Sequence, residues 1–152
     1  RELCFGCLQR ELDGAVLLRP IGLVHSDLIA GQAPPRARSE HAVIELDERY
    51  TPALLRIEEH SQLQVLFWFD RAPQQAQLQQ HRMGDASTPP RGVFGLRSPH
   101  RPNPLGLTTV RLLTAEGNRL IVSGLDAWDG TPVLDIKPYS KVYDQAVEPA
   151  AG

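Results

Sequence analysis

The sequence has few cysteines and no long hydrophobic segment. Its 152 residues include only Cys4 and Cys7, too few for a scaffold held together by disulfides. The longest apolar run, residues 63–69, is interrupted by Gln64, whereas a membrane span needs about 18 apolar residues. Residues 1–14 carry several charged side chains and do not resemble a secretory signal. We therefore expect a cytoplasmic protein with no membrane partner.

The sequence also lacks the motifs of several large enzyme classes. It contains no GxSxG, P-loop or GxGxxG, the usual signals of nucleophile-elbow hydrolases, P-loop enzymes and Rossmann dinucleotide binders. Its five histidines are scattered and form no HExxH motif. Cys4 and Cys7 form a CxxC without a second pair, so they are either free thiols or ligands of a zinc shared between two chains. We expect free thiols and no resident metal.

Charge is unevenly distributed along the chain. The net charge is −2, but residues 71–111 carry +5 and the remaining residues carry −7. No acidic residue lies between Asp85 and Glu116. A basic segment attracts phosphates or carboxylates, although an arginine-rich solvated loop would have the same composition.

The pattern of apolar residues predicts many short strands. In residues 41–47, Ala42, Ile44 and Leu46 fall on one face, which is the alternation of a half-buried strand. Thr51 and the proline after it resemble the start of a helix, which we expect to end near residue 59. The other expected elements are strands at residues 15–25, 63–69, 92–96, 105–114, 119–125 and 132–136, and a helical piece at residues 74–81 within an exposed loop at residues 71–90.

Proline and glycine are frequent, with 13 and 12 residues respectively. This content suits strands joined by turns and argues against a helical bundle. Because 41% of the residues are hydrophobic, the chain can bury a core. We predict a mostly β fold, a small single-domain β-barrel with one or two short helices. The barrel domain is expected over residues 15–143, between an N-terminal extension at residues 1–14 and a C-terminal tail at residues 144–152.

Residues 91–106 have the composition of a binding site. Three prolines within six residues make this segment a stiff, extended loop. Arg97 and Arg101 offer planar guanidinium groups to a carboxylate or phosphate, while Ser98 and Asn103 add neutral hydrogen-bonding groups. The alternative is a barrel corner stiffened by proline, whose arginines pair with acids on the surface.

Residues 123–139 form a second candidate segment. Asp126, Asp129 and Asp135 fall at strand ends, where a carboxylate can accept a hydrogen bond from an amine or a ribose hydroxyl. The alternative is a hairpin turn at Asp129 and an ion pair between Asp135 and a nearby basic residue.

Taken together, these two segments resemble the TsaA-like family (also YaeB-like or TrmO) of S-adenosyl-L-methionine-binding β-barrels. The resemblance spans residues 20–143 and rests mainly on GVFGLRSPHRPNPLGL at residues 92–107 and GLDAWDGTPVLDIKPY at residues 124–139. Shorter matches are IGLVHS, PPRAR and VLFWFDR, which begin at Ile21, Pro34 and Val65. The resemblance implies a homodimeric barrel that uses S-adenosyl-L-methionine (SAM) to methylate the N6 nitrogen of N6-threonylcarbamoyladenosine at position 37 of the tRNA anticodon loop.

The resemblance also implies a set of cofactor-binding residues. Two of them depart from the pattern typical of the family, since Ala37 replaces a glutamine and Asp70 replaces a histidine. The implied set is Pro35, Arg36, Ala37, Asp70, Arg71, Arg97, Leu107, Ser123, Gly124, Leu125 and Asp126.

Methyl transfer to a weakly nucleophilic nitrogen favours a general base in an apolar pocket. Asp126 and Tyr139 are the candidate bases, and we expect Phe94, Leu107 and Leu125 to line the pocket. Arg91 and Arg101 would contact RNA phosphates. Two alternatives stay open: a non-catalytic RNA-binding barrel that stacks bases on Trp68 or Trp128, and a methyltransferase of this fold with a small-molecule substrate.

Overall fold

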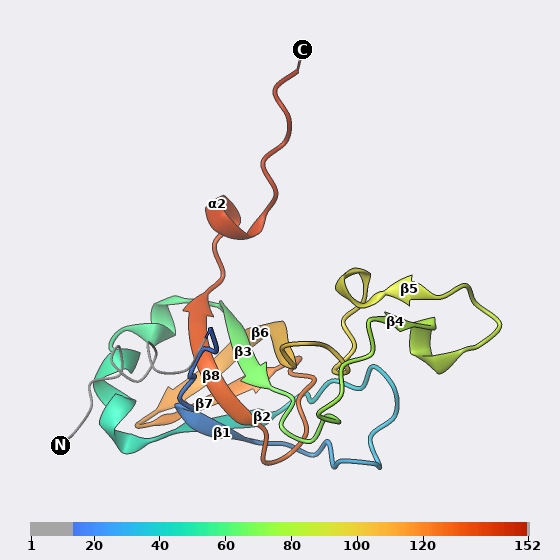
Figure 1. Ribbon diagram of the computed structural model, residues 1–152. Coiled ribbons are helices and arrows are strands. Elements are labelled where there is room, and N and C mark those ends of the chain that lie inside the picture. Colours follow the sequence, from blue (N-terminus) through green and yellow to red (C-terminus); the bar gives the residue numbers. More distant parts are fainter. Residues whose placement is uncertain (1–13, 152) are drawn as a thin grey trace.

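The strands of the chain close into a barrel (Figure 1). The computed structural model describes residues 14–151. Six antiparallel strands follow one another around the barrel in the order β1-β2-β7-β6-β3-β8, and β8 pairs back with β1, so the barrel itself has no free edge. The predicted mostly β, single-domain barrel is confirmed. The strands are β1 (Gly22–His25), β2 (Ala42–Leu46), β3 (Gln62–Trp68), β6 (Leu105–Glu116), β7 (Arg119–Ser123) and β8 (Pro132–Pro138).

Alternate side chains of the strands fill the barrel. In β3, Leu63, Val65 and Phe67 are buried, and the residues between them are more exposed. The same alternation buries Ala42 and Ile44 in β2. Because successive side chains of a strand point to opposite faces, this pattern fixes which face of each strand points into the core.

Two of the predicted strands are much shorter in the structure. The strand expected over residues 15–25 is confined to β1, since Pro20 has no N–H to donate to a neighbouring strand. The strand expected over residues 92–96 reduces to β5 (Arg91–Gly92), because its partner β4 (Gln79–Gln80) offers only two residues. The chain then continues as the 3₁₀ turn η4 (Val93–Gly95).

The helix expected over residues 51–59 is wrong in type and in its start. The structure has two 3₁₀ segments, η1 (Glu48–Leu54) and η2 (Ile57–Glu59). Asp47, not Thr51, caps η1 by accepting a hydrogen bond of 3.1 Å from the backbone N–H of Arg49. Between the two segments Arg56 has a φ of 64°, a left-handed conformation that no α-helix continues through.

The helical piece expected at residues 74–81 is also wrong, because β4 and the turn η3 (Arg82–Gly84) occupy the region around it. The chain after Tyr139 forms one helical turn, α2 (Lys141–Asp144), before the irregular end. The backbone N–H of Ser140 donates to Asp144 Oδ2 at 2.6 Å and closes this turn. Cys4 and Cys7 lie outside the described residues, and the expected domain limits remain predictions.

A long connection leaves the barrel between β3 and β6. It comprises residues 69–104, which we call the excursion, and contains β4, η3, β5 and η4. In Figure 1, β4 and β5 stand away from the barrel, at the right of the view. The excursion closes where the backbone N–H of Phe69 donates to the carbonyl of Pro104 at 2.8 Å. It contains most of the basic segment and the loop predicted at residues 71–90.

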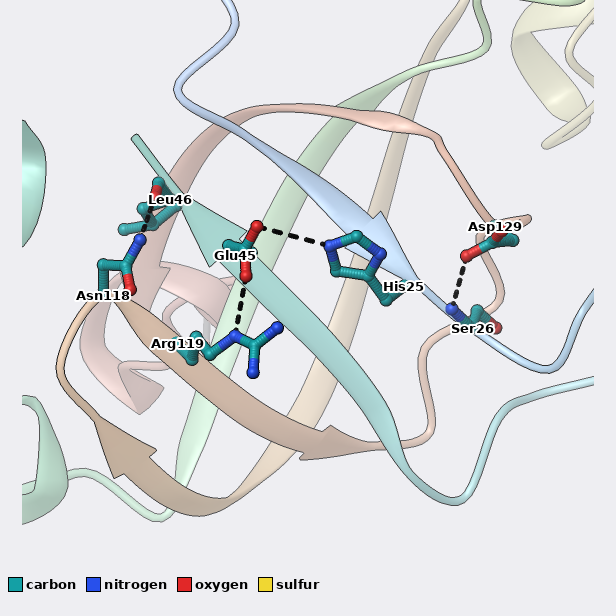
Figure 2. A network of polar contacts seen from close by, with 7 residues as sticks. All are labelled: His25, Ser26, Glu45, Leu46, Asn118, Arg119 and Asp129. Atoms are coloured by element: carbon teal, nitrogen blue, oxygen red, sulfur yellow. Dashed lines mark hydrogen bonds and ion pairs between the residues drawn. The ribbon is translucent and has the colours of Figure 1, made fainter. Parts of the chain in front are cut away.

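Ion pairs tie three strands together on the outside of the barrel (Figure 2). Glu45 on β2 accepts a hydrogen bond of 2.7 Å from Arg119 Nε on β7. Its other carboxylate oxygen lies 3.6 Å from Nε2 of His25 on β1. The hydrogen bond and charge of Arg119, together with His25, hold the pKa of Glu45 below its usual value.

Within residues 14–151, no helix has the length and apolar character to cross a membrane.

Candidate functional site

Two cavities adjoin at the end of the barrel from which the excursion leaves. The arginine cavity has a volume of about 530 Å³, and the tryptophan cavity has a volume of about 400 Å³. Both volumes fall in the range of small-molecule sites. Three residues line both cavities: Phe67, Phe69 and Asp126.

The two cavities differ in the side chains that line them. The arginine cavity is lined by Leu66, Phe67, Phe69, Phe94, Leu96, Arg97, Arg101, Pro102, Asn103, Leu105, Gly106, Leu107, Thr108 and Asp126. The tryptophan cavity is lined by Leu28, Ala33, Pro34, Pro35, Arg36, Ala37, Phe67, Phe69, Asp70, Arg71, Ala72, Pro73, Pro99, His100, Asp126, Ala127, Trp128 and Thr131.

A glycine lets an aromatic ring form the shared floor. Phe67 on β3 pairs with Gly106 on β6, and a Cβ at that glycine would lie 2.3 Å from the ring of Phe67. Phe69 packs edge-on against Phe67, with ring centroids 5.3 Å apart. The missing side chain at Gly106 therefore makes room for the buried ring of Phe67, against which the partly buried Phe69 packs beneath both cavities.

Asp126 stands where the two cavities meet. The chain leaves β7 through Gly124, whose φ of 92° suits glycine, and Leu125 then forms an isolated bridge with Ser39. In this bridge the N–H of Ser39 donates to the carbonyl of Leu125 at 2.7 Å, which brings residues 34–38 beside Asp126. The hydroxyl of Thr108 donates to Asp126 Oδ1 and orients the carboxylate.

Backbone carbonyls hold the arginines of the arginine cavity. Arg97 donates from Nη2 to the carbonyl of Leu107. Arg101 donates from Nη1 to the carbonyls of Leu96 and Ser98, at 2.9 and 3.3 Å. The Arg101 bonds lie within the proline-rich loop (residues 91–106), and the Arg97 bond joins this loop to β6. These hydrogen bonds stiffen the loop in addition to its prolines.

A cation–π contact shapes the tryptophan cavity. The guanidinium carbon of Arg71 lies 5.6 Å from the centre of the Trp128 ring. Arg71 Nη2 also donates to the carbonyl of Asp129 at 2.5 Å, and its Nε lies 3.6 Å from Asp70 Oδ1. On another wall, Arg36 adopts a φ of 61° in the turn that places residues 34–37 along the cavity.

The structure brings together most of the residues that the sequence analysis assigned to a site. Asp126 lines both cavities, and Arg101 and Phe94 line the arginine cavity. Two of the other expected cofactor residues, Arg97 and Leu107, line the arginine cavity. Those that line the tryptophan cavity are Pro35, Arg36, Ala37, Asp70 and Arg71.

Other expected site residues lie elsewhere. Ser123, Gly124 and Leu125 line neither cavity, and Leu125 is buried in the barrel core, so its expected place in the pocket lining is wrong. Tyr139 lies at the opposite end of the barrel, where its N–H donates to the carbonyl of Gln62 at 3.0 Å. Arg91 is exposed on β5 and also lines neither cavity.

Phe69, Thr108 and His100 are among the lining residues that the sequence analysis did not identify. Phe69 ends an apolar run that predicted only a buried strand, and Thr108 is buried within β6. His100 belongs to the proline-rich motif, and its Nδ1 is buried without a hydrogen-bond partner among residues 14–151. The position of His100 between two prolines of that motif was the available signal. Within the same residues, no group of three or more His, Cys, Asp or Glu side chains is placed to hold a metal ion.

Comparison with known proteins identifies the family. A family model described as the tRNA-methyltransferase O N-terminal domain matches residues 27–145. The chain belongs to the TrmO family. The resemblance found in the two sequence motifs is thereby confirmed. The TrmO family match covers the walls of both cavities, from Leu28 to Thr131.

Several relatives are similar over most of this chain. An "S-adenosyl-L-methionine-binding protein" of Archaeoglobus fulgidus is 43% identical over 132 residues, which cover 85% of this chain and 93% of that protein. A mouse "tRNA (adenine(37)-N6)-methyltransferase" is 39% identical over 151 residues, 91% of this chain but 34% of the mouse protein. The crystal structure of TrmO from Pseudomonas aeruginosa superposes with a TM-score of 0.64 at 34% identity, over 91% of this chain and 62% of that one. This chain thus spans about a third of the length of several curated relatives.

Proposed function

We propose that this chain binds SAM in the two adjoining cavities and methylates the N6 nitrogen of N6-threonylcarbamoyladenosine at position 37 of tRNA. One observation carries the proposal: four separate segments of the chain line two cavities that share Asp126. They are residues 33–37, 69–73, 94–108 and 126–131. Relatives named for SAM binding and for tRNA methylation support the cofactor and the substrate respectively.

The donor set of the cavities fits SAM. The cofactor carries two cationic centres, a carboxylate and a purine nucleoside. Asp126 and Asp70 offer negative charge to the cations, and Arg97 offers a guanidinium group to the carboxylate. Phe67 and Phe69 form an apolar floor that keeps water away from the line where the cavities meet.

Bound SAM supplies an electrophilic methyl group on a positively charged sulfur. The chain must hold the acceptor nitrogen in line with that methyl and take up the proton which the nitrogen loses. Asp126 faces both cavities and is oriented by Thr108, so it is the residue best placed to accept this proton. Tyr139, at the far end of the barrel, does not reach the same cavities in this chain.

The substrate is proposed to be the anticodon loop of tRNA. Arg91 projects from the excursion and is free to contact a phosphate, whereas Arg101 bonds two carbonyls of its own loop and is better described as a support. We also infer that the protein acts as a homodimer, which light scattering of the purified protein would test. A small-molecule methyl acceptor is the second candidate, because the Archaeoglobus relative of similar length is named only for SAM binding.

Calorimetric titration with SAM tests the cofactor. We expect saturable binding to the wild-type protein and a loss of about 10- to 100-fold in Asp126→Asn, which removes one charge without changing the shape. Asp135→Asn is the matched control, because Asp135 pairs with Lys137 and lines neither cavity. A wild-type protein that does not bind millimolar SAM would exclude the proposed cofactor.

Methyl transfer from labelled SAM tests the substrate. The assay compares two anticodon stem-loops that differ only in whether adenosine 37 carries the threonylcarbamoyl group. We expect transfer to the modified stem-loop alone. SAM binding with no transfer to either RNA would favour the small-molecule acceptor.

A further inference from the structure

The two tryptophans of the chain are equally exposed but differently placed. Trp128 is 41% exposed and lines the tryptophan cavity, whereas Trp68 is 42% exposed and lines neither cavity. A single exposed apolar side chain on a convex surface is ordinary and needs no explanation. A half-exposed indole in the wall of a concave site is different, because a ligand that enters the cavity can cover it.

Trp128 is held in place before any ligand arrives. The Arg71 guanidinium lies over its ring and is itself tied to the carbonyl of Asp129. Backbone hydrogen bonds also fix the chain at Trp128. The N–H of Thr131 donates to the carbonyl of Trp128 at 3.1 Å, and the N–H of Asp129 donates to the carbonyl of Leu28 at 2.8 Å. A ligand that contacts the indole therefore gives up little of its binding energy to order it.

The surroundings of Trp128 suit a flat, largely apolar group. The tryptophan cavity is walled in part by Leu28, Pro34, Pro35 and Ala127, and the arginine cavity has polar groups such as Asn103. Purine rings stack on aromatic side chains, and this contact is usually worth more than the apolar area it covers. The chemical difference between the cavities favours the nucleoside end of the cofactor on the tryptophan side.

We propose that Trp128 is the stacking platform for the adenine ring of SAM, so that the tryptophan cavity holds the adenosine half of the cofactor. The proposal rests on the proposed function and deepens it, because it assigns one half of the cofactor to one cavity. Arg71 acts as a positioning residue that keeps the indole in the cavity wall. The remainder of the cofactor then extends toward Asp126.

Tryptophan fluorescence and calorimetry test this assignment with S-adenosylhomocysteine, which keeps the adenosine half and lacks the methyl group. In a Trp68→Phe protein, Trp128 is the only indole, and we expect S-adenosylhomocysteine to quench it while L-methionine does not. In Trp128→Phe the remaining indole, Trp68, should not respond. Affinity for S-adenosylhomocysteine should fall about tenfold or more in Trp128→Leu. It should fall only a few-fold in Trp128→Phe, which keeps an aromatic face, and should be unchanged in Trp68→Leu.

The outcomes distinguish a failure of this assignment from a failure of the proposed function. If the wild-type protein binds SAM but Trp128→Leu binds S-adenosylhomocysteine as tightly as wild type, the stacking role is wrong and the SAM site stands. If S-adenosylhomocysteine leaves Trp128 fluorescence unchanged but a purine-containing RNA quenches it, Trp128 serves the RNA instead. If the wild-type protein binds neither cofactor form, both proposals fail. Thermal unfolding of each variant identifies a loss that comes from misfolding.

Discussion

Thr108 donates its hydroxyl hydrogen to the carboxylate of Asp126, and this bond connects the buried interior of β6 to the line where the two cavities meet. Thr108 itself is almost fully buried, so its hydroxyl has no bulk water as an alternative partner. The bond therefore fixes the orientation of a carboxylate that is otherwise exposed to both cavities.

Replacing Thr108 with valine should impair methyl transfer more than cofactor binding. Valine keeps the shape of threonine but leaves one oxygen of Asp126 without its donor, so the carboxylate is no longer aimed. We expect the rate of transfer at saturating SAM to fall about tenfold, and stability to fall by about 1–2 kcal/mol. Thr109→Val is the control, since Thr109 is the next residue on β6 and faces outward. Equal losses in the two variants would show that the hydroxyl does not orient Asp126.

Replacing Gly106 with alanine should destabilise the floor of the site. The added Cβ would lie 2.3–2.8 Å from three carbon atoms of the buried Phe67 ring, so either the ring or β6 must shift. Such overpacking typically costs about 1–3 kcal/mol, which chemical denaturation would detect. Gly95→Ala tests the same chemical change where an added Cβ meets nothing within 4 Å, and it should be close to neutral. A Gly106→Ala protein as stable as wild type would mean that the Phe67 ring can move away freely.

The barrel was predictable because its strands carry their own periodicity. Alternating polarity over residues 41–47 and an apolar run over residues 63–69 each predicted a strand. The structure has β2 and β3 at these positions, each with one face buried. The helix over residues 51–59 was not predictable in type. Its cap lies four residues earlier at Asp47, and the left-handed conformation of Arg56 divides it, which no periodicity of side chains records.

The sequence predicted only those site residues that belong to the motifs of the family. The resemblance named residues from four segments, and seven of them, together with Asp126, line the cavities. It could not place Tyr139, because the antiparallel register of β3 with β8 carries the end of β8 away from the cavities. Nor could it show that Leu125 points into the core, since that follows from its bridge to Ser39, 86 positions earlier in the chain.

The pairing of Glu45 with Arg119 predicts an acid-dependent loss of stability. The pKa of Glu45 is lower in the folded protein than its usual value of 4.5, with the Arg119 hydrogen bond as the main cause. A lowered folded-state pKa stabilises the fold above about pH 4.5, and this contribution is lost as the pH falls through the folded-state value. Glu45→Gln should therefore be less stable than wild type near neutral pH, and the difference should shrink toward zero in acid. Arg119→Gln should show the same pH dependence as Glu45→Gln, and a difference that stays constant with pH would contradict the assignment.

Arg91 should affect RNA binding without affecting the cofactor. It is exposed on β5 and lines neither cavity, so Arg91→Ala should leave the affinity for SAM unchanged. Loss of one phosphate contact should weaken tRNA binding several-fold and reduce the slope of log affinity against log salt by about 1. Arg56→Ala is the control, because Arg56 is also exposed but lies between η1 and η2, where its Nε bonds Glu59. An unchanged salt slope in Arg91→Ala would remove this residue from the RNA contact. Arg101→Ala separates the two roles, since loss of its bonds to the carbonyls of Leu96 and Ser98 should lower the stability of the loop and the affinity for SAM together.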